Sequence, residues 1–325
     1  MKVCIYGAGA VGGHIAARLA EGGAEVSLVA RGEHLAAIRA NGLRVETKDG
    51  VFVSQPVATD DPSSLGRQDV VVVSVKAPAL PGIVAGIKPL LGDETLVLFA
   101  LNGIPWWYLQ GQGGMLEGAS LPRIDPQSLL TAAIAPERVV GAVAYTACTV
   151  TAPGVIKAEN PRNRLILGRP DGKSDARLDA LAECLIRGGL EIEVTDRIRD
   201  AIWTKLVINL TGGSLAILTA STMKQALASP AISKTAQAMA NEAASIARKL
   251  GCDPGDVEEG LRRLAVSTHK QSILQDLELG RSMEVDTILR APLELARLAD
   301  VETPALDLVV DLAVQRAKAA GLYDN

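Results

Sequence analysis

The feature that most constrains the fold is a glycine-rich turn directly after a short apolar strand at the start of the chain. The strand is predicted over residues 3–6, and the turn has the spacing Gly7-x-Gly9-x-x-Gly12. In a unit that binds a dinucleotide, the first glycine makes the tight turn and the second lets the backbone approach a pyrophosphate. The third lets the helix pack closely on the strand. For so short a motif, a turn without a ligand is the alternative.

The residues around this turn supply the rest of a β-α-β unit. Ala10 and Val11 open a helix, and the N–H groups and partial positive charge at a helix N-terminus attract phosphate. Apolar residues continue the helix over residues 16–20, and residues 25–30 read as a second strand. A unit of about 30 residues is the context that the motif requires. We therefore predict dinucleotide binding.

The end of the second strand indicates which dinucleotide binds. An acidic residue there accepts hydrogen bonds from the ribose of NAD, whereas an arginine accommodates the 2′-phosphate of NADP. This chain has Arg31 at that point and no carboxylate before Glu33. A guanidinium gives a fork-shaped, charge-assisted contact to phosphate. We predict NADPH/NADP as the cofactor; a solvated surface arginine is the alternative.

Composition excludes several other classes of protein. The 325 residues are 48% hydrophobic and 22% charged, with a net charge of −4, so no basic footprint for nucleic acid is present. The four cysteines and three histidines are scattered, which predicts neither disulfides nor a metal site. No apolar run reaches the roughly 20 residues of a membrane span. We expect a cytoplasmic protein without a membrane partner, and a homodimer is possible for an Ala/Leu-rich helical domain.

The order of predicted elements indicates an α/β fold with two domains. Strands are predicted over 70–75, 95–100, 139–150, 163–168 and 191–194, with helices between them at 81–91 and 176–187. Alternating strands and helices predict a doubly wound, mainly parallel sheet of the Rossmann type. From residue 196 the pattern is almost entirely helical. We predict an NADP-binding domain over residues 1–195 and an all-helical substrate and catalytic domain over residues 196–325.

Two local features interrupt this plan. Residues 42–53 are predicted to form a pair of strands around Asp49-Gly50, which is a good hairpin turn. Residues 111–135 read as a long surface loop with one short helix, and loops of this length are often functional covers or simply mobile.

Four places carry polar residues that suit chemistry beside a nicotinamide. Lys76 follows the strand 70–75, and Asn102 follows the next strand; ligands of open α/β sheets bind at the carboxyl ends of strands. Turn chemistry is the alternative for both.

The other two places lie in the helical part. Lys205 and Asn209 are spaced i and i+4 on one predicted helix, so they share a face among apolar neighbours. A lysine there is costly unless it has a role, although it can also extend to the helix edge. Glu284 and Asp286 begin a helix after a glycine break, where acidic residues also favour the helix dipole.

The pattern as a whole resembles the ketopantoate reductase (2-dehydropantoate 2-reductase) family. In this order and spacing the matching motifs are specific, and they span most of the chain. They are Gly7-x-Gly9-x-x-Gly12, Arg31, Val75-Lys76-Ala77, Asn102-Gly103, Lys205-x-x-x-Asn209, Ser272, and Glu284-Val285-Asp286 after Gly280-Arg281.

The resemblance implies a Rossmann domain joined to a helical domain, with the active site in the cleft between them. It implies an NADP-dependent oxidoreductase acting on CH–OH donors, which reduces 2-dehydropantoate to pantoate in pantothenate biosynthesis. Lys205 is then the general acid that protonates the carbonyl oxygen, and Glu284 orients the substrate and holds the lysine. Asn209 and Ser272 are implied to hydrogen-bond the substrate.

The resemblance also assigns a cofactor site. Lys76 and Asn102 are implied to lie beside the nicotinamide ribose and the reacting centre, so Asn102 belongs to both the cofactor and the substrate sites. The predicted cofactor-binding residues are Gly7, Gly9, Ala10, Val11, Gly12, Arg31, Lys76 and Asn102.

The chain departs from the family in two places. Many members carry a second asparagine one helical turn after the first, where this chain has Gly212-Gly213-Ser214. Trp106 and Trp107 stand in a chain otherwise poor in aromatic residues, and they line either a larger pocket or a packed interface. A related opine- or hydroxyacid-type dehydrogenase with a bulkier substrate therefore stays open. A non-catalytic NADP-binding redox sensor is a further alternative, although a sensor needs neither Lys205 nor Glu284.

Overall fold

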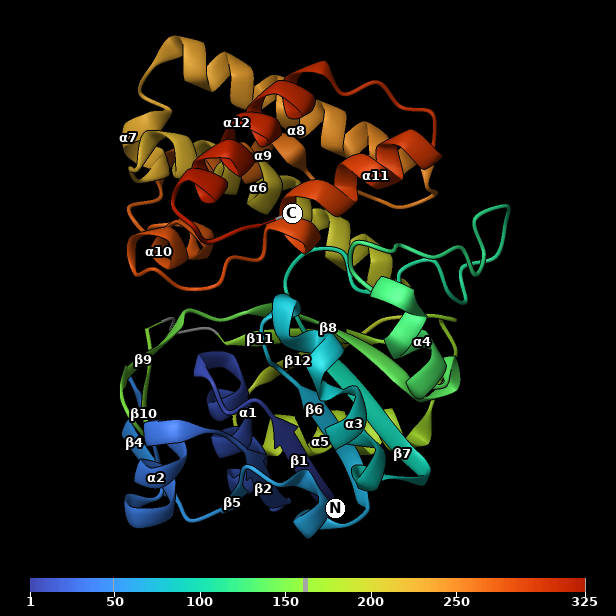
Figure 1. Ribbon diagram of the computed structural model, residues 1–325, viewed down its shortest axis with the longest axis vertical. Helices are drawn as coiled ribbons and strands as arrows, with labels where there is room; N and C mark the ends of the chain where they lie inside the picture. The colour runs from blue at the N-terminus through green and yellow to red at the C-terminus, as the bar shows by residue number, and fades with distance from the viewer. Residues whose placement is uncertain (49, 160–162, 325) are drawn as a thin grey trace. The chain divides into compact units, whose positions relative to one another are not determined.

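The computed structural model describes residues 1–48, 50–159 and 163–324, and its elements are labelled in Figure 1. The chain forms two compact units. The first comprises residues 1–101, 107–120 and 127–198, and the second comprises residues 102–106, 121–126 and 199–325. The main division thus falls between Ile198 and Arg199. The boundary after residue 195 remains a prediction about folding domains, and the sequence did not indicate that two short early segments join the second unit.

An eight-stranded sheet forms the centre of the first unit, in the order β12-β11-β8-β7-β6-β1-β2-β5. Every described pair in it is parallel except β8 with β11. The β-branched side chains of β6 are buried on both faces, as in a sheet covered by helices. The strands are β1 (Lys2–Tyr6), β2 (Glu25–Val29), β5 (Val57–Thr59), β6 (Gln68–Val73), β7 (Leu91–Ala100), β8 (Val139–Tyr145), β11 (Arg164–Gly168) and β12 (Glu191–Val194).

The helices of this unit are α1 (Ala10–Glu21), α2 (Gly32–Asn41), α3 (Val84–Ile87), α4 (Leu129–Ala133) and α5 (Ala176–Arg187). Short 3-10 turns accompany them: η1 (Pro62–Leu65), η2 (Ala77–Ile83), η3 (Lys88–Leu90), η4 (Pro126–Ser128) and η5 (Pro136–Arg138). The helix predicted over 81–91 is therefore divided into η2, α3 and η3. Pro81 lies inside η2 and Pro89 within η3, and proline lacks the N–H that a continuous α-helix requires.

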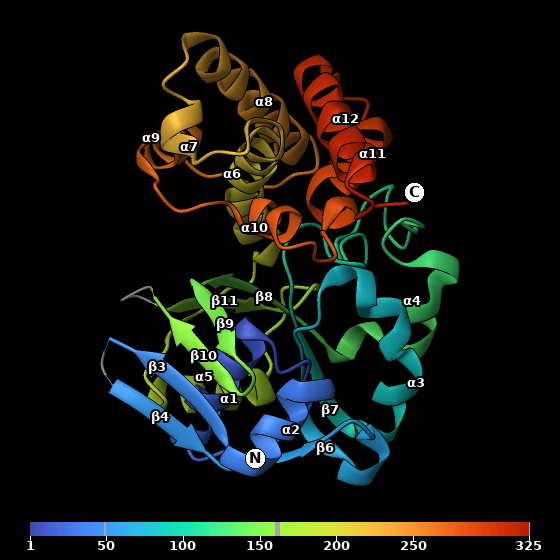
Figure 2. The same ribbon diagram turned by 60° about the vertical axis from the view of Figure 1, so that its left-hand side comes forward.

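A second sheet of four strands packs against α1, and the sequence predicted the hairpin within it but not the sheet. Its order is β4-β3-β10-β9 (Figure 2), with β3 (Leu43–Thr47), β4 (Gly50–Ser54), β9 (Cys148–Ala152) and β10 (Val155–Ala158). The predicted strand 139–150 is thus divided between β8 and β9. A Cβ at Gly13 of α1 would lie 2.1 Å from Ile156, and Arg18 of α1 stacks 4.5 Å from the ring of Phe52. The predicted hairpin is the antiparallel pair β3–β4, and Asp49 of its turn lies outside the described residues.

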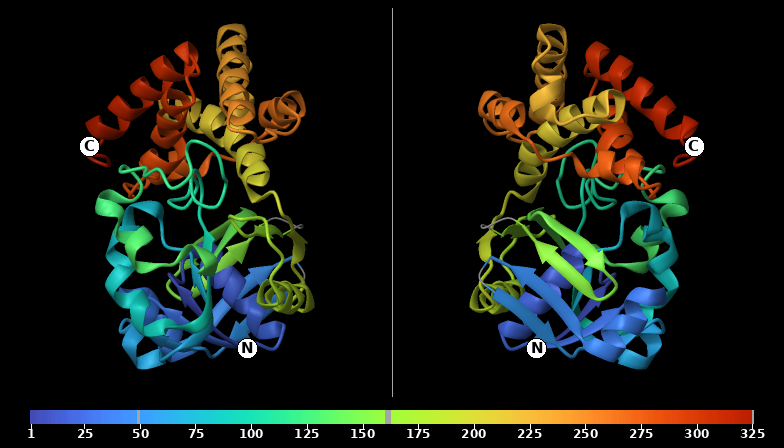
Figure 3. Two further views of the ribbon diagram at one scale, coloured as in Figure 1. Left: turned by 90° about the vertical axis from the view of Figure 1, so that its right-hand side faces the viewer. Right: turned by 90° about the vertical axis from the view of Figure 1, so that its left-hand side faces the viewer.

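The second unit is built of helices, drawn in yellow to red in Figure 3. They are α6 (Ile198–Thr219), α7 (Met223–Ala226), α8 (Pro230–Lys249), α9 (Val257–Val266), α10 (Ser272–Glu278), the π-helix η6 (Asp286–Arg290), α11 (Ala291–Leu298) and α12 (Pro304–Ala319). Prolines stand in the first turns of α8, α11 and α12, where a missing N–H costs nothing. The predicted fold class, a Rossmann-type sheet followed by helices, is confirmed.

Helix α6 has 22 residues and contains an 18-residue window with a mean hydropathy of 1.4, so by length and composition it also passes as a membrane span. No uninterrupted apolar run of that length occurs in it, because Lys205 and Asn209 lie within it. Of its most apolar 18-residue window, 67% is buried inside the protein, as is ordinary for a helix in a protein core.

Candidate active site

The glycine-rich turn joins β1 to α1 and is tightly packed. Gly7 has φ +103°, and a Cβ there would lie 2.6 Å from the side chain of Val75. Ser74 donates a hydrogen bond of 2.8 Å to the carbonyl of Gly7. A Cβ at Gly12 would lie 2.2 Å from the Ser74 hydroxyl. Two of the three motif glycines are therefore required by the close approach of the segment that follows β6.

Gly9 differs, because a Cβ at this position would meet nothing within 4 Å. Gly9 is the N-cap of α1, and the first turn of that helix, which includes Ala10 and Val11, carries no acidic residue. The space in front of the helix N-terminus is thus open, and its partial charge is not countered from within the turn. These features fit a dinucleotide pyrophosphate.

His34 supports the same turn and was not predicted from the sequence. Its Nδ1 accepts a hydrogen bond of 3.0 Å from the N–H of Gly154, so the proton must lie on Nε2. Nε2 lies 2.7 Å from the carbonyl oxygen of Ala8 and donates to it. One neutral imidazole thus ties the glycine-rich turn to the loop between β9 and β10.

Arg31 and Lys76 lie where the sequence predicted, after two strands that flank β1. Arg31 is the exposed N-cap of α2, directly after β2. Its positive charge opposes the increase that burial causes in the pKa of Tyr6, so Arg31 lies close to the carboxyl end of β1. Lys76 is the half-buried N-cap of η2, after β6. Because β1, β2 and β6 are parallel neighbours, their carboxyl ends meet at one edge of the sheet.

In the second unit, three predicted residues form one chain of hydrogen bonds. Nζ of Lys205, on α6, donates to Oδ1 of Asn102 at 2.8 Å. Nδ2 of Asn102 lies 3.3 Å from Oε2 of Glu284 and donates to it. Glu284 is 8% exposed, and Lys205 and Asn102 are half-buried. An amide therefore bridges an ammonium and a carboxylate, with its oxygen toward the cation and its nitrogen toward the anion.

This arrangement shifts the pKa of Lys205. Burial lowers that pKa from 10.5 to about 8, because desolvation penalises the charged form. The negative charge of Glu284 acts in the opposite direction and favours the ammonium. A lysine with a pKa of about 8 is mostly protonated at neutral pH and gives up its proton more readily than an ordinary lysine. It is suited to act as a general acid.

The backbone around η6 holds Asn102 beside Glu284. The N–H of Ile104 donates to the carbonyl of Thr287 at 2.8 Å. Gly103 has φ +82°, and a Cβ there would lie 2.3 Å from the same carbonyl group. The glycine after Asn102 is therefore needed for the loop to lie on η6. The sequence predicted Asn102 and Glu284 as site residues, but it gave no sign that the turn at Glu284 supports the loop at Asn102.

The remaining predicted substrate residues lie on helices of the second unit. Asn209 is half-buried, one turn after Lys205 on α6. Ser272 is exposed at the first residue of α10. A Cβ at Gly213, within the stretch 212–214 that stands where many family members have a second asparagine, would lie 3.2 Å from Ile273, so α10 closely approaches α6 there. The roles of Asn209 and Ser272 in binding a substrate stay predictions.

The two tryptophans are buried, Trp106 with 3% and Trp107 with 1% exposure. A Cβ at Gly141 of β8 would lie 2.5 Å from the ring of Trp107 and 2.9 Å from Ile198. Trp107 is therefore a packing residue of the first unit, held over a glycine of the central sheet.

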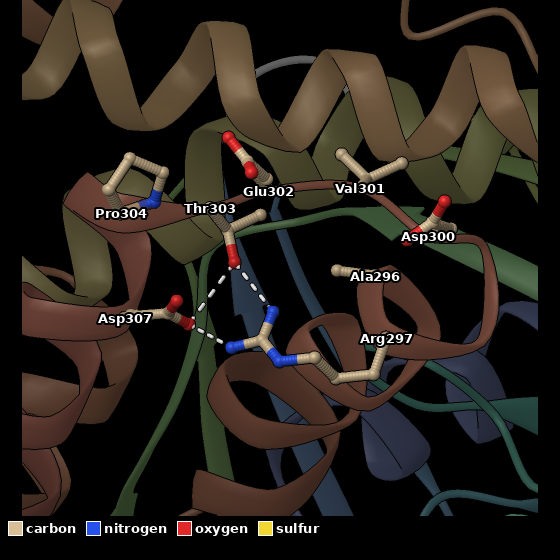
Figure 4. A pocket seen from close by; sticks show the side chains of 8 residues that line it. All are labelled: Ala296, Arg297, Asp300, Val301, Glu302, Thr303, Pro304 and Asp307. Carbon is tan, nitrogen blue, oxygen red and sulfur yellow. Dashed lines mark hydrogen bonds and ion pairs between the residues drawn. The ribbon is translucent and has the colours of Figure 1, made fainter.

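A surface cavity of about 410 Å³ lies on the second unit, away from the predicted residues in sequence. Its lining residues, drawn in Figure 4, are Ala296, Arg297, Asp300, Val301, Glu302, Thr303, Pro304 and Asp307. The guanidinium of Arg297 already binds the Thr303 hydroxyl at 2.9 Å and the Asp307 carboxylate, so its charge is compensated. Among the described residues no cluster of His, Cys, Asp and Glu suits a metal ion.

Comparison with known proteins shows the family to which the chain belongs. The family model for ketopantoate reductase PanE/ApbA matches residues 3–172, and the model for the C-terminal domain of ketopantoate reductase PanE/ApbA matches residues 197–317. The chain belongs to the ketopantoate reductase family. It is thus an oxidoreductase with an NAD(P)-binding Rossmann domain.

Individual relatives match over nearly their whole lengths. A 2-dehydropantoate 2-reductase from Mesorhizobium japonicum is 43% identical, over 99% of this chain and 100% of the relative. A candidate ketopantoate reductase from Ralstonia solanacearum MolK2 superposes with a TM-score of 0.92 at 37% identity, covering 99% of both chains. A D-mandelate dehydrogenase solved with NADH and anilino(oxo)acetate superposes with a TM-score of 0.83 at 22% identity, over 99% of this chain and 100% of that one. At that identity the likeness shows the fold alone.

Proposed function

We propose that the protein reduces 2-dehydropantoate (ketopantoate) to pantoate with NADPH, with Lys205 as the general acid. The observation that carries the proposal is the hydrogen-bonded chain from Lys205 through Asn102 to Glu284, together with the pKa of about 8 at Lys205. The 43% identity to a 2-dehydropantoate 2-reductase supports the choice of substrate.

In this mechanism each group of the chain has a definite task. When bound, NADPH would supply a hydride to C2 of the keto acid. Lys205 donates a proton from Nζ to the carbonyl oxygen, so that the carbonyl becomes a hydroxyl, and it then takes a proton from solvent. Before transfer, the ammonium also stabilises negative charge as it develops on that oxygen. Glu284 keeps the lysine charged, and Asn102 fixes the direction of its N–H bonds.

The cofactor preference rests on Arg31. It lies exposed after β2, where a guanidinium suits the 2′-phosphate of NADPH, and no acidic residue stands between the end of β2 and Glu33. Gly7, Gly9, Gly12 and Lys76 are proposed to hold the rest of the cofactor. We propose that Asn209 and Ser272 hydrogen-bond the substrate.

The test is steady-state oxidation of NADPH and of NADH by the purified protein, with ketopantoate and with a panel of bulkier 2-keto acids. Rapid turnover of ketopantoate with NADPH supports both the substrate and the cofactor. If a bulkier acid is reduced and ketopantoate is not, the proposed substrate is wrong but the proposed reaction stands. That result is the one expected of an opine- or hydroxyacid-type dehydrogenase. Dinucleotide binding without turnover of any acid contradicts the proposal and favours the redox sensor.

A further inference from the structure

A second polar cluster of the helical unit surrounds Asp286, two residues after Glu284. The hydroxyl of Tyr323 donates to Oδ1 of Asp286 at 2.6 Å. Nη1 of Arg123 lies 3.4 Å from the same oxygen and 3.4 Å from the Tyr323 hydroxyl. The three residues come from distant parts of the sequence: the segment 121–126, the first residue of η6, and the end of the chain after α12.

The cluster is shielded from solvent on several sides. The side chains of Arg123 and Asp286 are 32% and 25% exposed. Burial and the hydrogen bond to Asp286 both raise the pKa of Tyr323, so its hydroxyl keeps its proton and remains a donor. Glu294 lies nearby; burial and Asp286 raise its pKa, and Arg123 opposes the increase. Arg123 and Arg290 both oppose the increase in the pKa of Tyr323, so both cations act on this cluster, and Arg123 contacts Asp286 directly.

The backbone next to Asp286 holds the catalytic groups. The N–H of Ile288 donates to the carbonyl of Glu284 at 3.2 Å, and the carbonyl of Thr287 accepts from Ile104. The segment 284–288 therefore includes Glu284 itself, and it also supports the loop that carries Asn102. Asp286 opens a π-helix, a form that is less regular than an α-helix and that often occurs at functional sites.

We propose that Tyr323, assisted by Arg123, is a positioning residue that fixes the turn 284–288 and thereby keeps Glu284 and Asn102 aligned with Lys205. The last residues of the chain then take part in catalysis without touching substrate. This inference rests on the proposed function, because the turn matters for the reaction only if Lys205 is the general acid. Supporting contacts of this kind matter because small misplacements of reacting groups slow a reaction strongly.

The test is Tyr323→Phe, which removes one hydroxyl and keeps the ring. We expect kcat/KM for the 2-keto acid to fall by about 5- to 10-fold, with the dinucleotide Kd unchanged. We also expect the alkaline limb of the pH profile to move to lower pH, since a displaced Glu284 supports the ammonium of Lys205 less well. Tyr145→Phe, a matched change on β8 of the other unit, is expected to leave both quantities unchanged.

Arg123 gives an independent check if Tyr323→Phe folds poorly. Arg123→Lys keeps the charge and is expected to retain most of the activity, whereas Arg123→Ala is expected to repeat the shift in the pH profile. Wild-type kcat/KM and pH profile in Tyr323→Phe overturn the proposal, even if its melting temperature falls. So does an equal loss in Tyr145→Phe.

A readout without turnover separates this inference from the proposed function. The pH dependence of acetylation of Lys205 by acetic anhydride, followed by peptide mass spectrometry, reports the pKa of that amine. If wild-type protein reduces no 2-keto acid, the proposed function fails, and this labelling still tests the alignment. A lower pKa in Tyr323→Phe than in wild type supports the inference, and an unchanged pKa overturns it.

Discussion

Replacing Glu284 with glutamine tests whether its charge sets the pKa of the general acid. A glutamine can still accept the hydrogen bond from Asn102 through its oxygen, so the substitution removes charge and keeps shape. The two hydrogen bonds through the amide, of 2.8 and 3.3 Å, limit how far apart the charges lie. At a separation of about 8 Å and an effective dielectric constant of about 20, unit charges attract by about 2 kcal/mol, or about 1.5 pKa units.

The pKa of Lys205, about 8 in the wild-type protein, is therefore expected to fall in Glu284→Gln. With a pKa of about 6.5, the protonated fraction at pH 7 drops from about 90% to about 25%. Reduction needs the protonated lysine, so the rate declines as pH rises through this pKa, and the variant should decline about 1.5 pH units earlier.

The assay is the pH dependence of kcat/KM for NADPH oxidation with the 2-keto acid, from pH 5 to 10. Glu258→Gln is the matched control, because Glu258 is an exposed carboxylate on α9 that pairs with Arg262. The reasoning is refuted if the alkaline limb of Glu284→Gln stays at the wild-type position, or if the control shifts it equally.

Four further substitutions separate the roles of the other residues. Lys205→Ala is expected to lower kcat by about 10²- to 10⁴-fold with unchanged NADPH affinity in a fluorescence titration; near-normal kcat would exclude it as the acid. Gly9→Ala should weaken NADPH binding in that titration without lowering the melting temperature, because its Cβ meets nothing within 4 Å. Gly12→Ala should instead lower the free energy of unfolding by about 1–3 kcal/mol in urea, because its Cβ would lie 2.2 Å from Ser74. A destabilised Gly9→Ala together with a fully stable Gly12→Ala would contradict both expectations. Arg31→Ala should raise the KM for NADPH about 10-fold or more and leave the KM for NADH unchanged. An equal rise in both KM values would remove the basis for the predicted preference for NADP.

The sequence was informative where local chemistry determines structure. The glycine-rich turn, the buried strand β6 and the proline-led helices follow from conformational rules that act within a few residues. The i, i+4 spacing placed Lys205 and Asn209 on one helix, and α6 carries both. The resemblance to a known family then brought Asn102 and Glu284 into the same proposal.

Contacts between distant segments were not predictable in this way. The sheet formed by β3, β4, β9 and β10 joins segments about 100 residues apart, and its strands are short. In the sequence, His34 looks like an ordinary helix residue. Only the structure shows that its two ring nitrogens form hydrogen bonds with the backbone of Ala8 and of Gly154. Tyr323 and Arg123 meet at Asp286 only because the chain brings three segments together. No local pattern specifies such pairings, since they depend on tertiary packing.

The central claim is that NADPH passes its hydride to C2 of a 2-keto acid while Lys205 supplies the proton. The most direct measurement uses NADPH with deuterium at both C4 positions of the nicotinamide, with ketopantoate, in single turnovers followed by mass spectrometry. We predict that the wild-type protein yields pantoate carrying one deuterium at C2, and that Lys205→Ala binds the cofactor but forms labelled product at least about 100-fold more slowly. Unlabelled product from the wild-type protein, or labelled product from Lys205→Ala at the wild-type rate, would contradict the claim.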